Sequence, residues 1–141
     1  MLRRFALKHP MTRFVVGASA VIHLASETID IAGGHELLAP TLLRSQALST
    51  LHEAVHRGEM TADAGRDRLG RIGQMKIRYL GDAVLRRRAW DLAEKLGWAS
   101  TYDAEYVALT QLQAGALVTL DTELARLAEG TVQVASIEDL Q

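Results

Sequence analysis

Two aspartates near the end of the chain have the type and spacing of a divalent-cation site. Asp121 directly follows the apolar run 116–120, and Asp103 lies eighteen residues earlier, in the first turn of a predicted helix. In an open parallel sheet, functional side chains collect beyond the carboxyl ends of the strands. Two carboxylates that converge there without a basic partner repel each other, and a hard cation relieves that repulsion. Helix capping is the competing interpretation for each aspartate.

A second motif, 52–56 (HEAVH), has the spacing of the zinc-peptidase pattern H-E-x-x-H. Histidines at i and i+4 of a helix share a face and can bind Zn²⁺ together, with the glutamate as general base. The extended form of the motif needs a third histidine at position 62, which is Ala62. A zinc peptidase is therefore a remote alternative, and two surface histidines in a helical hairpin are the simpler interpretation.

The composition is that of an ordinary globular domain. The 141 residues are 48% hydrophobic and 23% charged with a net charge of −1, and they can enclose one core. No apolar run reaches the roughly 20 residues of a membrane helix, and the basic segment 1–10 lacks the apolar stretch of a secretory signal. The absence of cysteine excludes disulfides, thiolate metal sites and a cysteine nucleophile. These features favour a cytoplasmic protein, with Met11 as an alternative start.

The charges are unevenly distributed along the chain. Residues 66–88 contain eight Lys or Arg and two Asp, whereas residues 101–141 contain seven acids and Arg126 alone. Either these charges are solvated helix faces, or they form a basic rim beside an acidic pocket. An enzyme acting on phosphodiesters needs such a rim to hold the backbone and such a pocket to hold a cation. The arginine run 86–88 by itself is more typical of a solvated helix face.

The elements that must position these residues are helices alternating with short apolar strands. This alternation predicts an α/β fold with a parallel sheet. The predicted strands are 14–16, 37–39, 116–119 and 131–135. The predicted helices are 20–25 capped by Ser19, 41–57 ending at Gly58, 61–69 capped by Thr61, 83–96 ending at Gly97, 101–113 and 122–127. The two helices between 41 and 69 form a hairpin, and Gly70 and Gly73 end it.

Two segments carry a resemblance to a known family. The pair 102–109 (YDAEYVAL) and 117–121 (LVTLD) resembles the C-terminal signature of PIN domains, and 14–20 (FVVGASA) is similar to their first strand and loop. The similarity runs from about residue 13 to the end. It implies a PIN-like fold in residues 13–141, with a short parallel sheet flanked by helices and a helical hairpin, after an N-terminal extension 1–12.

The resemblance also implies roles for individual residues. PIN domains are metal-dependent nucleases, and many small stand-alone ones are VapC-like toxins of bacterial toxin–antitoxin pairs. By position, Asp103 and Asp121 would bind Mg²⁺ or Mn²⁺. The hydroxyls of Thr119 and Ser19 would support the site.

The chain departs from the family pattern at two acid positions. The first acid falls at Gly17, which offers no side chain, and the second falls near Gln46, whose carbonyl oxygen can still face a cation. Loss of a central carboxylate should weaken Mg²⁺ binding severely. Glu105 and Glu123 are candidate substitutes, although both are more typical of a helix surface. The chain is then either a naturally silent member or one inactivated by a change to glycine.

The implied function is that of a Mg²⁺-dependent endoribonuclease toxin, impaired by Gly17. Proteins of this type form homodimers and are inhibited by a cognate antitoxin, and we expect the hairpin 41–69 to make both contacts. The alternative from a different class is a non-catalytic PIN-like module that binds RNA or an antitoxin.

Overall fold

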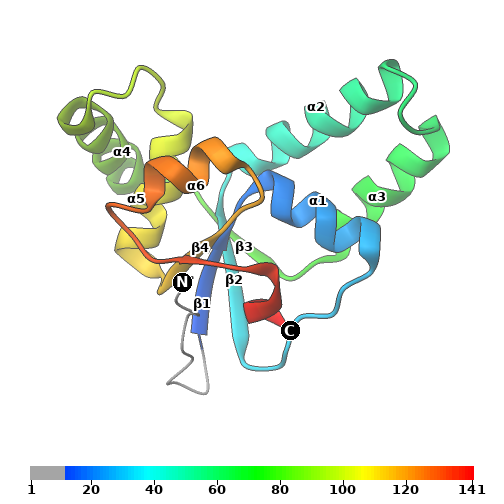
Figure 1. The fold of residues 1–141 in the computed structure, drawn as a ribbon, viewed down its shortest axis with the longest axis horizontal. Helices are drawn as coiled ribbons and strands as arrows, with labels where there is room; N and C mark the ends of the chain where they lie inside the picture. Colours follow the sequence, from blue (N-terminus) through cyan, green and yellow to red (C-terminus); the bar gives the residue numbers. More distant parts are fainter. Residues whose placement is uncertain (1–11) are drawn as a thin grey trace.

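The computed structural model describes residues 12–141, in which five parallel strands form one sheet in the order β3-β2-β1-β4-β5 (Figure 1). The strands are β1 (Thr12–Val16), β2 (His35–Pro40), β3 (Ile77–Leu80), β4 (Ala116–Val118) and β5 (Val134–Ala135). The predicted α/β class with a parallel sheet is confirmed, and the arrangement is consistent with a PIN-like fold. The predicted extension 1–12, with Met11, lies outside the described residues except for Thr12, which begins β1.

Six α-helices and one short 3₁₀ helix flank this sheet in the described part of the chain. They are α1 (Ala18–Glu27), α2 (Leu42–His56), α3 (Ala62–Gln74), α4 (Ala83–Leu96), α5 (Tyr102–Gln113), α6 (Thr122–Ala128) and η1 (Ile137–Leu140). The α2–α3 hairpin projects as an arm on one side, and α4 lies on the other (Figure 1). None of the helices in residues 12–141 is long and apolar enough to cross a membrane.

Strand β1 is the centre of the core. Phe14, Val15 and Val16 are all 0% exposed. Because neighbouring side chains of a strand point to opposite faces, both faces of β1 must be covered. Helix α5 lies against β1, β2 and β4, and α4 packs on α5. The continuous apolar run in the sequence is therefore a strand buried on both faces.

Several predicted helix ends are confirmed. The Thr61 hydroxyl accepts a hydrogen bond from the Ala64 N–H at 3.1 Å and caps α3. Gly58 and Gly97 have positive φ angles of 77° and 73° and follow the ends of α2 and α4. Glycine adopts this left-handed conformation without steric cost, so it terminates helices efficiently.

Predicted boundaries differ from the structure most clearly in three elements. Helix α1 begins at Ala18, with Gly17 rather than Ser19 at its N-cap position. Helix α3 continues through Gly70 and Gly73 to Gln74, because glycine in a helix costs only about 1 kcal/mol and the buried Ile72 anchors this turn in the core. The last strand is shorter than predicted and contains only Val134 and Ala135.

Strand β3 was absent from the prediction. It has four residues, none of them fully buried, and one of them is the exposed Arg78. A strand at the sheet edge with so little apolar patterning gives a weak signal in the sequence.

The sheet order places a topological switch point between β1 and β4. From β1 the chain continues to β2 and β3 on one side, and it later returns to β4 and β5 on the other. Val16 is the register partner of Val118, and the Gly17 N–H donates to the Val118 carbonyl at 2.9 Å. The residues that follow β1 and β4 therefore lie side by side, at the edge where open α/β sheets bind ligands.

Candidate metal site at the carboxyl edge of the sheet

Two hydroxyl groups join the loops that follow β1 and β4. The Ser19 Oγ accepts a hydrogen bond from the Leu120 N–H at 2.9 Å and lies 3.3 Å from the Thr119 Oγ1. The Thr119 Oγ1 in turn accepts from the Asp121 N–H at 3.1 Å. Ser19 and Thr119 thus lie together at the predicted site, and they hold the backbone that carries Asp121.

Asp121 caps helix α6 with one of its two carboxylate oxygens. Its Oδ1 accepts from the backbone N–H groups of Glu123 at 3.0 Å and Leu124 at 3.2 Å. The Oδ2 has no hydrogen bond within the described residues. A carboxylate has about four acceptor positions, so the cap leaves this second oxygen available to a ligand. The capping and metal-binding interpretations of Asp121 are therefore compatible.

Asp103 lies in the first turn of α5, close to Asp121. Partial burial raises the pKa of the Asp103 carboxyl, and the negative charges of Asp121 and Glu123 raise it further. The structure thus brings together the two aspartates that the sequence singled out, and no basic side chain of residues 12–141 lowers the pKa of Asp103. A nearby cation would remove the cost of ionising this pair.

Gly17 is the position at which the PIN-domain resemblance predicts the first acid. Its backbone is extended, with φ −79° and ψ 164°, so any amino acid could adopt it. A Cβ there would lie 3.0 Å from the Thr119 Oγ1 and 3.2 Å from the Thr119 Cβ. A side chain at position 17 therefore points into the site and requires Thr119 to move by a few tenths of an ångström.

Gln46 makes a contact that the sequence did not reveal. The Tyr106 hydroxyl donates to the Gln46 Oε1 at 2.5 Å, so the carbonyl oxygen expected to face a cation is bound to a phenol. Tyr106 is 2% exposed. Its burial, and then the charges of Glu105 and Asp103, raise the pKa of its hydroxyl well above the usual range, so the proton is retained.

Sequence reasoning missed Tyr106 as a site residue, although two signals pointed to it. Tyr106 lies three residues after Asp103, and side chains at i and i+3 of a helix share a face. A tyrosine within a buried helical stretch also needs a partner for its hydroxyl. Together these signals place a phenol beside Asp103.

Of the two candidate substitute acids, Glu123 is already engaged. Glu123 forms a salt bridge with Arg126 at 2.7 Å, and this hydrogen bond lowers the pKa of Glu123. Burial raises the pKa of Glu105, and the charge of Arg86 partly offsets that effect. Within residues 12–141 no third acidic side chain joins Asp103 and Asp121 in a group arranged to hold a metal ion.

The single basic rim is not formed. The basic residues of 66–88 are distributed over α3, β3 and α4. Arg71 pairs with Asp67 at 3.0 Å, and Arg78 lies 3.6 Å from Glu36. Among these basic residues, Arg86 is the one whose charge lowers the pKa of an acid near the site, Glu105.

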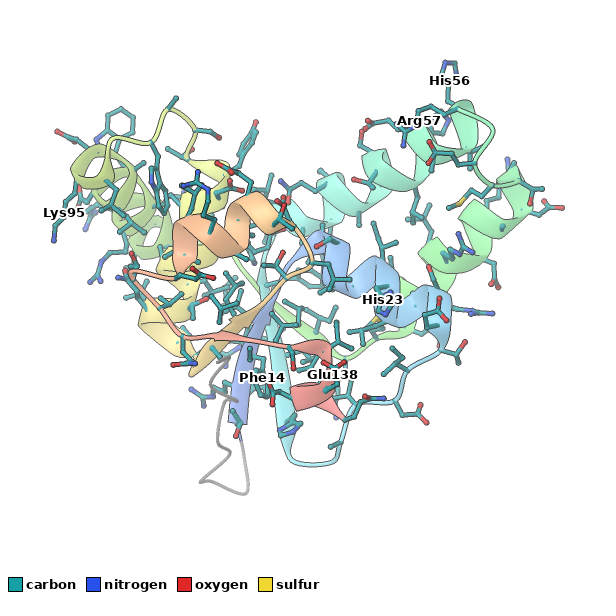
Figure 2. The ribbon with its side chains drawn as sticks, in the orientation of Figure 1. Phe14, His23, His56, Arg57, Lys95 and Glu138 are labelled. Atoms are coloured by element: carbon teal, nitrogen blue, oxygen red, sulfur yellow. The ribbon has the colours of Figure 1, made fainter. Side chains whose placement is uncertain are left out.

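The zinc-peptidase motif lies elsewhere. His52 and His56 are exposed on α2, and His56 is at the far tip of the arm, away from the sheet (Figure 2). Glu53 accepts a hydrogen bond from the Ser49 hydroxyl at 2.6 Å. Within residues 12–141 no group of three or more His, Cys, Asp or Glu side chains is arranged to hold a metal ion, so a third ligand for this motif is missing.

The donor set at the carboxyl edge fits a hydrated Mg²⁺. This ion keeps several waters and is commonly held by one or two carboxylates together with substrate phosphates. Asp103 and the second oxygen of Asp121 provide that number of carboxylates. The site therefore suits a weakly held cation that substrate phosphate would help to bind.

Comparison with known proteins supports the fold alone. The sequence matches no protein-family model and no curated protein. The crystal structure of PAE2754 from Pyrobaculum aerophilum is similar to this chain, with a TM-score of 0.68 and 23% identity over 92% of this chain and 94% of that one. The likeness extends over nearly the full length of both chains, so the α/β architecture is shared as a whole.

Proposed function

We propose that this chain is a PIN-type, Mg²⁺-dependent endoribonuclease of the toxin class, with a cation site weakened by Gly17. The observation that carries the proposal is the convergence of Asp103 and Asp121 at the switch point of the sheet, where burial and like charge raise the pKa of Asp103. When bound there, Mg²⁺ would activate water and neutralise the phosphodiester oxygens under attack. RNA and an antitoxin as partners imply a cytoplasmic location.

The test compares this chain with Gly17→Asp and Gly17→Asn in RNA cleavage with Mg²⁺ and with Mn²⁺. Both substitutions add the same Cβ beside Thr119, but only aspartate adds a negative charge. We expect Gly17→Asp to cleave at least about 100-fold faster than Gly17→Asn, since a third carboxylate strengthens cation binding directly. Equal rates for the two variants would exclude position 17 from the site.

The second candidate function is a non-catalytic PIN-like module that binds RNA or an antitoxin. Two observations favour it: Gly17 has no side chain, and the Gln46 carbonyl is bound to Tyr106. RNA binding without cleavage by this chain and by Gly17→Asp would establish this function in place of the nuclease.

The α2–α3 arm is the surface we propose for the homodimer and antitoxin contacts. A pocket of about 130 Å³ on this arm is lined mainly by apolar residues, including Leu48, Leu51 and Leu69, and Leu48 is 54% exposed. Leu48→Lys should weaken these contacts if the arm makes them. Unchanged self-association and antitoxin binding would place both contacts elsewhere.

A further inference from the structure

The orientation of the Gln46 amide is set by a hydrogen bond between two helices. The Tyr106 hydroxyl on α5 donates to the Gln46 Oε1 on α2, at 2.5 Å. Because burial keeps the phenol protonated, this direction of donation is stable across the physiological pH range.

The other half of the amide is left open. The Gln46 Nε2 has no hydrogen-bond partner within residues 12–141, and it is not among the buried polar atoms that lack one. The Gln46 Nε2 is therefore in contact with solvent and can donate to a ligand. The Tyr106 bond links this nitrogen to the helix that carries Asp103.

An amide N–H binds anions and repels cations. Gln46 lies in α2, which follows the carboxyl end of β2, and Asp103 and Asp121 at this edge of the sheet are suited to a cation. A phosphodiester bound to that cation brings negatively charged oxygens to the same edge. We infer that Gln46 binds the nucleic acid, donating an N–H to a non-bridging phosphate oxygen, and that Tyr106 positions it. This inference rests on the proposed function and replaces the expected role of Gln46 as a cation ligand.

The experiment measures cation and RNA binding separately. Mn²⁺ affinity is measured by calorimetry without RNA, and RNA affinity by anisotropy with labelled fragments of total cellular RNA in saturating Mn²⁺. Gln46→Met should weaken RNA binding by about tenfold and leave Mn²⁺ affinity unchanged, since it removes a hydrogen bond to a charged group. Gln46→Glu should bind Mn²⁺ more tightly and RNA more weakly.

Two further variants test the position and the coupling. Gln113→Met, an exposed change at the far end of α5, is the matched control and should alter neither affinity. Tyr106→Phe should weaken RNA binding in the parent chain but have no further effect in Gln46→Met, because the phenol acts through the amide. A purely structural role for Tyr106 predicts equal losses in both backgrounds.

Each outcome bears on a different claim. Loss of Mn²⁺ affinity in Gln46→Met would make Gln46 a cation ligand and overturn the inference. RNA binding that depends on Asp121 but not on Gln46 would also overturn it, while leaving the proposed function intact. An absence of RNA binding by the parent chain in Mn²⁺ would overturn both.

Discussion

The two ends of the parallel sheet differ in shape and in charge. At the amino end, a cavity of about 770 Å³ is lined largely by apolar side chains, among them Ile29, Ile31 and Ile77. At the carboxyl end, the loops after β1 and β4 bring together small polar side chains and two aspartates. By concavity alone, the amino end would be chosen as the functional site.

Charge balance reverses that choice. The carboxylate of Glu36, at the amino end, lies 3.1 Å from Arg13 and 3.6 Å from Arg78, so its charge is compensated. Within the described residues, the carboxylates of Asp103 and Asp121 have no such partner, and the pKa of Asp103 is raised. Uncompensated charge held in place by the fold is a better sign of a ligand than empty volume is.

The largest expected effect is at the carboxyl end and separates the two uses of Asp121. Asparagine caps a helix about as well as aspartate does, but it removes the charge. Asp121→Asn should therefore keep its stability and lose at least about tenfold in Mn²⁺ affinity. Calorimetric titration and thermal unfolding measure the two properties.

The alanine variant completes this test. Asp121→Ala should lose Mn²⁺ affinity in the same way. It should also lose about 1 kcal/mol of unfolding free energy, because the side chain that caps α6 is removed. If Asp121→Asn binds Mn²⁺ as well as the parent does, Asp121 is only a cap and the contrast between the two ends disappears.

A smaller effect is expected at the amino end. The buried Nδ1 of His35 lacks a hydrogen-bond partner within the described residues, and its ring packs edge-on against Phe14 at 5.1 Å. His35→Phe should retain the ring contact, remove the unpaired nitrogen and raise the unfolding free energy by about 1 kcal/mol. Urea denaturation at mildly alkaline pH measures this. A change in Mn²⁺ affinity would show that the two ends are coupled.

The smallest expected effect is the pH dependence that Asp103 gives to the stability of the fold. Its pKa is raised in the folded protein, so the folded state binds the proton more tightly than the unfolded chain does. Stability should therefore fall as the pH rises from the usual range of an aspartate through this raised pKa. Asp103→Asn removes the cost of ionising this carboxyl. Its free energy of unfolding at neutral pH should exceed that of the parent by less than about 1 kcal/mol, because the group is partly solvated.

The measurement is thermal unfolding of both proteins across the acid-to-neutral range, with and without Mn²⁺. The higher stability of Asp103→Asn should vanish at low pH, where the Asp103 carboxyl of the parent protein is protonated. Mn²⁺ should stabilise the parent more than the variant. A parent that is more stable than the variant at neutral pH without metal would mean that Asp103 has a favourable partner.

The positions of the two candidate aspartates in the fold were predictable because their signals are local. Asp121 follows an apolar strand directly, and Asp103 stands at a helix start, so strand and helix periodicity place both. Strand β3 escaped prediction because its four residues are only partly buried at an edge. The partners of Ser19 and Gln46 escaped it for another reason. Each bonds to a residue far away in the sequence, and only the assembled sheet brings such pairs together.

The bond between Ser19 and the backbone of Leu120 spans 101 positions, so the site has a consequence for biosynthesis. A ribosome completes β1 and α1 early, but the strand that pairs with the other side of β1 emerges about a hundred residues later. Until then the edge of β1 is open, and such edges promote aggregation. A nascent or truncated chain that ends before β4 contains no assembled carboxyl edge. If the proposed nuclease is active, its activity therefore begins only after β4 and the loop that follows it have been synthesised.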